Sequence, residues 1–150
     1  MMTLERTTGR YLEESLERRL DIYFRHIGRL DCLKKTIGTA DDLKKGTDCV
    51  IYGVPIDFTS DALKDNTVWH PEREMRLMNG VDVEFGIRTG NSHNGYTEFD
   101  EPTLVVYIKC FFGNIKHMME TIVDEFIKKF DDIFDVGQEL YYDFVYGVES

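Results

Sequence analysis

The run TLVVYIKCFF, residues 103–112, constrains the fold of this chain more than any other segment. It is almost continuously apolar, which is typical of a central β-strand that is covered on both faces. The segment GVDVEFGIR, residues 80–88, instead alternates between apolar and polar positions and predicts a half-buried strand. We therefore expect a β-sheet at the centre of the fold.

Two amphipathic segments predict helices that pack on this sheet. Residues 9–28 and a segment of about 20 residues that Asn114 would cap both repeat apolar side chains at helical spacing. The first stripe is Leu12, Leu16, Leu20, Tyr23 and Ile27, and the second is Ile115, Met119, Ile122, Phe126, Phe130 and Ile133. We expect one domain over residues 1–150, of α+β or α/β class, with a helix on each face of a mixed sheet.

The remaining segments complete this expectation. Residues 29–47 predict a connector with a short helical turn, and residues 60–79 and 89–102 predict irregular structure. The aromatic tail, residues 139–148, predicts an edge strand.

Residues 48–59 predict a β-hairpin around a type II′ turn at Gly53-Val54. In that register Asp48, Asp57 and Thr59 share the polar face, which we expect to point towards the N-terminal helix, and the apolar side chains share the other. The two aspartates would lie about 7–8 Å apart, close enough to bind one hard divalent cation. The alternative is a solvated face without a role.

The segment KGTDCVIYGVPIDFT, residues 45–59, resembles the core of the restriction-endonuclease-like PD-(D/E)XK nuclease superfamily. There, an aspartate that starts one strand is followed across a short hairpin by Asp/Glu-x-Lys. Asp48 matches the first acid, Asp57 the second, and Glu13 the helix glutamate of some branches. The resemblance implies a restriction-endonuclease-like fold, cleavage of DNA or RNA with Asp48 and Asp57 as catalytic residues, and Mg²⁺ or Mn²⁺ held by these two and Glu13. Glu13 also lies within the apolar stripe of its helix, and its alternative is a position at the stripe edge, reaching to water.

Thr59 stands where the superfamily has its lysine. A hydroxyl group carries no positive charge and cannot stabilise charge that develops on a phosphate as an ammonium does. Lys64, Arg88 and Lys109 are candidates for a replacement, and Arg88 is the best because it lies on the polar face of its strand. A surface Arg88 that faces Glu84 is the alternative.

The charge distribution supports a second class of function. The net charge is −10, with 12 basic and 14 acidic residues in 1–75 against 6 and 14 in 76–150. The acidic surface of the second half should bind nucleic acid poorly. Its charge either keeps the protein soluble or attracts a basic protein partner. The candidate partner-binding residues are Asp131, Asp132, Asp135, Glu139 and Asp143. The alternative to a nuclease is therefore an inactive phage or mobile-element inhibitor or adaptor that binds a nucleic-acid-binding protein.

Several other classes are not supported. No apolar run reaches the roughly 18 residues of a membrane span, and the charged N-terminus does not resemble a signal peptide, so we expect a cytoplasmic protein without a membrane partner. The three cysteines are expected to be reduced, and the four histidines lack zinc-site spacing. A homodimer is left open.

Overall fold

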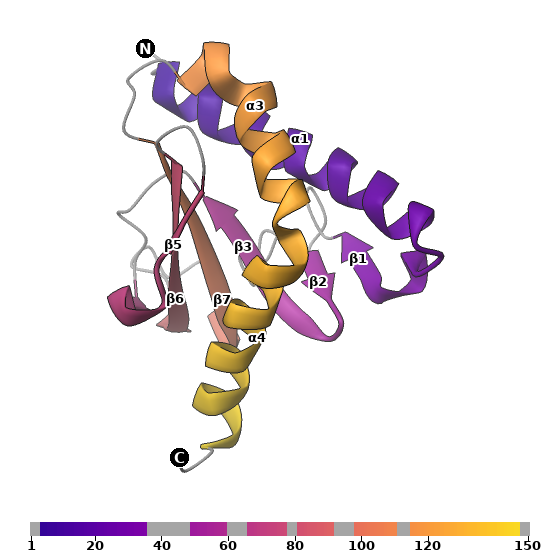
Figure 1. Ribbon diagram of the computed structural model, residues 1–150. Helices are drawn as coiled ribbons and strands as arrows, with labels where there is room; N and C mark the ends of the chain where they lie inside the picture. Colours follow the sequence, from indigo (N-terminus) through magenta and orange to yellow (C-terminus); the bar gives the residue numbers. More distant parts are fainter. Residues whose placement is uncertain are drawn as a thin grey trace.

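The structure is a computed structural model that describes residues 4–35, 49–59, 66–77, 81–91, 98–110 and 115–147. Three helices lie on a single mixed β-sheet (Figure 1). The helices are α1 (Leu4–His26), α3 (Ile115–Lys128) and α4 (Phe130–Tyr146), with short 3-10 turns η1 (Leu30–Cys32) and η2 (Pro71–Arg73). The strands are β1 (Leu33–Lys35), β2 (Cys49–Ile51), β3 (Val54–Thr59), β4 (Thr67–Trp69), β5 (Met75–Arg76), β6 (Val81–Asn91) and β7 (Glu98–Cys110).

The sheet confirms the expected central strand. Its order is β1-β2-β3-β7-β6-β4, and β5 also pairs with β6. β7 runs parallel to β3 and antiparallel to β6, so the apolar run that begins at Thr103 lies between two hydrogen-bonded neighbours. The α+β class and the mixed sheet with N-terminal and C-terminal helices are thereby confirmed.

All three helices lie on the same face of the sheet, so the expectation of a helix on each face is wrong. Leu16 of α1 and Phe126 of α3 belong to one cluster of buried residues with Phe85 and Leu104 of the sheet. α4 approaches that face closely at Gly137, where an added Cβ would lie 2.8 Å from Cδ2 of Leu104. The apolar stripes of α1 and α3 are buried together because both helices pack on one another and on one apolar sheet face.

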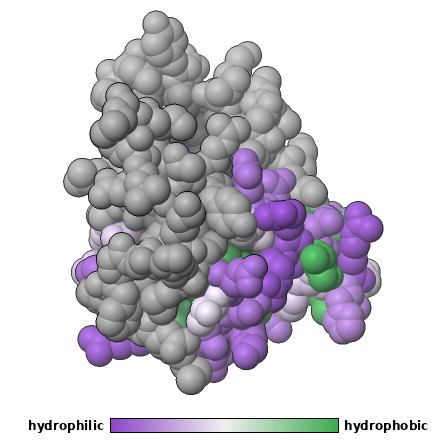
Figure 2. All heavy atoms as spheres, turned by 90° about the horizontal axis from the view of Figure 1, so that it is seen from above, coloured by the Kyte–Doolittle hydropathy of each residue, from purple (hydrophilic) through white to green (hydrophobic). Residues whose placement is uncertain are grey.

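The helix ends differ from the sequence expectation. Phe24 continues the buried stripe of α1, whereas Ile27 is 42% exposed, because α1 ends at His26. Seen from above, the described surface is mainly hydrophilic with small separate apolar spots (Figure 2). The predicted cap Asn114 and the side chains of Ile115 and Met119 lie outside the described residues.

The tail is helical and not an edge strand. α4 starts one residue after α3 and extends to Tyr146. Leu140 and Tyr141 are buried and follow Ile133 by seven and eight residues, so they continue the same helical stripe. The burial of this stripe outweighs the β-propensity of the aromatic residues.

The sequence prediction also missed three short strands of the sheet and the full length of the hairpin formed by β6 and β7. Residues 29–47 and 60–79, expected to be irregular apart from a helical turn, contain β1, β4 and β5, each at most three residues long. β6 and β7 extend into the predicted loop 89–102, and β6 is buried at polar positions such as Asp82 and Arg88 as well as at its apolar ones. Among the helices of the described ranges, none has both the length and the apolar character of a membrane span.

Candidate functional site

The β2–β3 hairpin turns at Tyr52-Gly53, not at Gly53-Val54. Cys49 pairs with Ile56 and Ile51 pairs with Val54. Tyr52 and Gly53 have φ values of 49° and 80°, as a type I′ turn requires, and this turn matches the twist of paired strands better than the predicted geometry. Because the register shifts by two positions, the described residues 49–59 keep the faces that we predicted for them.

Asp57 points away from the N-terminal helix, so this part of the prediction is wrong. Its neighbours Ile56 and Phe58 belong to the buried cluster beneath α1 and α3. Side chains alternate along a strand, so Asp57 lies on the opposite sheet face, and the sheet separates it from α1. Asp48 and the side chain of Glu13 lie outside the described residues.

Asp57 forms a buried ion pair with Arg88, the residue that was predicted to replace the missing lysine. Nη1 of Arg88 donates a hydrogen bond to Oδ2 of Asp57 at 2.7 Å, and the two side chains are 5% and 6% exposed. Arg88 is therefore not on the surface, which excludes the alternative of a solvated arginine. Its catalytic role stays a prediction.

The surroundings of this pair are polar and partly aromatic. Thr59 and Thr103 are buried on the same sheet face. The rings of Trp69 and Tyr107 lie 5.7 Å apart beside Gly86, where an added Cβ would come within 2.9 Å of the Trp69 ring. Glycine at this position therefore lets the indole pack closely against β6.

The ion pair limits what Asp57 can do chemically. A buried guanidinium already compensates the charge of this carboxylate, and that charge is what a divalent cation would need. Among the residues that the structure describes, no group of three His, Cys, Asp or Glu side chains is arranged to hold a metal ion. Lys109 stands opposite Asp82 in the β6–β7 register, four residues along β7 from the position opposite Asp57. Lys64 is not among the described residues.

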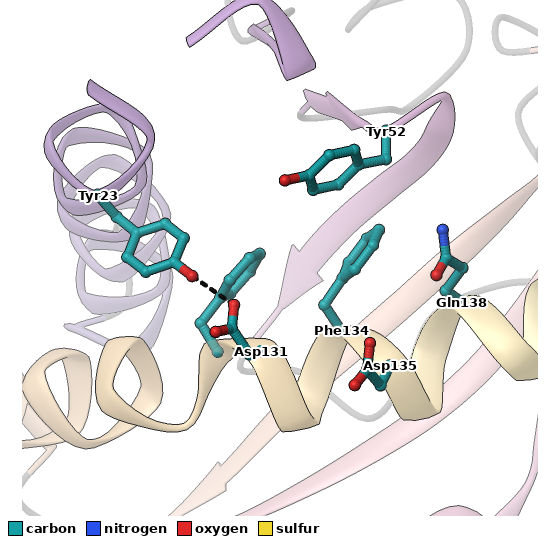
Figure 3. A pocket seen from close by; sticks show the side chains of 7 residues that line it. Tyr23, Tyr52, Asp131, Phe134, Asp135 and Gln138 are labelled. Carbon is teal, nitrogen blue, oxygen red and sulfur yellow. Dashed lines mark hydrogen bonds between the residues drawn. The ribbon is translucent and has the colours of Figure 1, made fainter. Parts of the chain in front are cut away.

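A second site is a pocket of about 420 Å³ where α1, the β2–β3 turn and α4 meet (Figure 3). Its lining combines aromatic rings, two carboxylates and one amide. The lining residues are Tyr23, Tyr52, Phe130, Asp131, Phe134, Asp135 and Gln138.

The aromatic side of the pocket is tightly packed. Tyr52 reaches in from the turn opposite Phe134, with ring centroids 5.6 Å apart, and it also contacts Phe24. Tyr23 packs edge-on against Phe130 at 5.4 Å. Tyr52 also has a left-handed backbone conformation, which the type I′ turn requires and which is unusual for a side chain of this size.

The polar side of the pocket is negative. The hydroxyl group of Tyr23 donates a hydrogen bond to Oδ1 of Asp131. Burial, together with this hydrogen bond and the charge of Asp131, raises the pKa of Tyr23 to about 12. Asp131 and Asp135 lie one turn apart on α4, and within the described part of the chain neither forms an ion pair with a basic side chain.

The five predicted partner-binding acids, all on α4, differ in their surroundings. Glu139 and Asp143 pair with Arg73 of η2 at 3.1 Å and 3.3 Å, and are therefore partly neutralised. Asp131 and Asp135 line the pocket, and Asp132 is exposed. The sequence prediction missed Tyr23, Tyr52 and Gln138, although the spacing of Asp131, Asp135 and Gln138 indicates one side of a helix.

In comparisons with protein-family models, curated proteins and solved structures, no match to this chain was found. The resemblance to the nuclease superfamily therefore stays a prediction.

We predict that Asp57 and Arg88 depend on one another for stability. Asp57→Ala and Arg88→Met should each lower the free energy of unfolding by about 3–5 kcal/mol, because each leaves one buried charge uncompensated. The double variant should lose less than the sum of the single losses, since no lone charge remains. Urea unfolding followed by circular dichroism measures all three.

The exposed pair Arg19–Asp124 serves as a control, with side chains 39% and 48% exposed. Asp124→Ala should cost less than about 1 kcal/mol. Additive losses in the Asp57/Arg88 double variant would contradict the prediction.

We also predict that one of the eight tyrosines titrates near pH 12 and that this step is lost in Tyr23→Phe. Folding raises this pKa from 10.0, so the associated stability is complete below about pH 10 and declines as the pH rises towards 12. Absorbance at the tyrosinate band follows the titration. A titration step near pH 12 that remains unchanged in Tyr23→Phe would contradict the assignment to Tyr23.

Proposed function

We propose that this chain is an acidic binding protein of the inhibitor or adaptor type, which engages a basic nucleic-acid-binding protein. The observation that carries the proposal is the unneutralised acidic surface of α4 beside the aromatic pocket. Within the described residues, Asp131, Asp132 and Asp135 form no ion pair with a basic side chain, whereas Asp124, Glu139 and Asp143 do.

Charge and shape both support this proposal. With a net charge of −10, the chain attracts basic partners over several ångströms and repels nucleic acid. Aromatic side chains beside the acids supply contact area that a purely charged surface lacks, and such residues are enriched where proteins bind tightly. Binding at this site would cover the basic surface with which the partner binds nucleic acid.

A second proposal, phosphodiester cleavage, is favoured by the proximity of Asp57 and Arg88. In this arrangement Asp48 and Asp57 would hold Mg²⁺ or Mn²⁺, and Arg88 would stabilise the charge of the phosphate in place of the missing lysine. Glu13 is not part of this proposal, because α1 covers the opposite sheet face. The buried ion pair has to open before Asp57 binds a metal ion, which makes this proposal the weaker one.

The binding proposal predicts that neutralising exposed acids of α4 slows association. The partner is first captured with the immobilised chain and identified, and it should be a basic nucleic-acid-binding protein. Asp132→Asn/Asp135→Asn should then slow its association about 5-fold at an ionic strength of about 0.02 M, and less than about 2-fold at about 0.5 M, because salt screens exposed charges. Stopped-flow mixing measures both rates.

The matched control is Glu72→Gln/Glu120→Gln, which removes the same charge from exposed positions on η2 and α3. This variant should associate at close to the wild-type rate. Equal slowing by both double variants would show that only net charge matters, and an unchanged rate in Asp132→Asn/Asp135→Asn would contradict the proposal.

The cleavage proposal predicts that the purified chain cuts DNA or RNA when Mn²⁺ is present and that Asp57→Asn does not. Asparagine keeps the size of the side chain but binds a hard cation more weakly than a carboxylate. The folded state of the variant is checked by circular dichroism. Absence of cleavage by the wild-type chain would remove this proposal, and cleavage would overturn the inactive inhibitor.

A further inference from the structure

We infer that the pocket between α1, the β2–β3 turn and α4 receives one arginine side chain of the basic partner. This inference rests on the proposed binding function and names the anchor of that interaction. The occupant is identified by its charge, by its flat shape and by its hydrogen-bond donors.

The negative charge of the pocket favours a cationic ligand. Asp131 and Asp135 face the same hollow, and in the described part of the chain no lysine or arginine neutralises them. Asp131 already accepts a hydrogen bond from Tyr23, which fixes the position of its carboxylate and leaves acceptor capacity for a second donor. Two carboxylates one helical turn apart repel one another slightly, and a positive group that binds both removes this repulsion.

The aromatic walls favour arginine over lysine. Tyr52 is 40% exposed, and its ring, supported from behind by the buried Phe134, offers a surface on which a planar guanidinium can stack. The compact and strongly hydrated ammonium of lysine gains less from such a flat wall. Arginine also carries five N–H donors, enough for Asp131, Asp135 and the side-chain oxygen of Gln138. The volume, about 420 Å³, lies within the range of pockets that take a whole side chain or a small ligand.

Access to the pocket is from solvent. Tyr52 is 40% exposed at its rim, and Asp135 is exposed. An arginine on the surface of a folded partner therefore reaches the pocket without rearrangement of the buried core. Asp132, which is not part of the lining, lies outside on the same helix and meets only the surrounding charges of the partner.

Three peptides that differ at only four positions test this inference. Each carries four equivalent positions in a Gly/Ser background, filled with arginine, with lysine or with citrulline, which keeps the shape of arginine without its charge. Fluorescence anisotropy at low salt measures binding to the full chain. The arginine peptide should bind at least about 5-fold more tightly than the lysine peptide, and the citrulline peptide should not bind.

Variants of the chain then locate the binding. Asp135→Asn should weaken the arginine peptide about 10-fold, whereas Asp132→Asn, which removes the same charge outside the pocket, should weaken it less than about 2-fold. Tyr52→Asn, which suits the left-handed backbone of the turn, should bring the arginine and lysine affinities close to one another. Circular dichroism confirms that each variant is folded.

Equal affinity for the arginine and lysine peptides, or equal weakening by Asp132→Asn and Asp135→Asn, would overturn the inference. If the captured partner still binds with strong salt dependence in that case, the proposed function stands and only the pocket assignment fails. Failure to capture a basic partner would remove the proposed function itself.

Discussion

The structure depends on the burial of one apolar sheet face beneath three helices. Alternating residues of β3, β6 and β7 supply this face, and the stripes of α1, α3 and α4 cover it. At about 25 cal/mol per Å² of buried apolar surface, this is the dominant favourable term in folding. It also requires that α1 and α4, which are distant in sequence, come together at one end of the β2–β3 hairpin.

The same burial explains why the other sheet face carries polar residues. Asp57 and Arg88 alternate with core residues on their strands, so they must point away from the helices. They are nevertheless buried, and a charge in that position is tolerated only when a partner compensates it. The pair therefore has a structural explanation that is independent of catalysis, and this favours the binding proposal over the nuclease proposal.

The aromatic pocket is a consequence of where the helices end. α3 and α4 are separated only by Lys129, and the start of α4 meets the last turns of α1 and the β2–β3 turn. Rings from three segments line that junction, and Phe130 and Phe134 contribute theirs from α4. The acids on the next positions of α4 are thereby placed at the rim of an apolar hollow, where their electrostatic interactions are stronger than in open water.

The sequence by itself determined the central strand, the helical stripes and the partition of the hairpin into an apolar and a polar face. These features follow from the backbone periods of 2 and 3.6 residues, which act over a few neighbouring positions. It left open whether Arg88 points inward or lies on the surface, and the structure buries this side chain against Asp57. Only the tertiary structure decided that the helices share a face, that Asp57 points away from α1, that the aromatic tail is helical, and that Tyr23, Tyr52 and Asp131 meet in one pocket. Each of these depends on which apolar surfaces cover one another, and long-range packing settles that choice because local periodicity is the same for either side of a sheet.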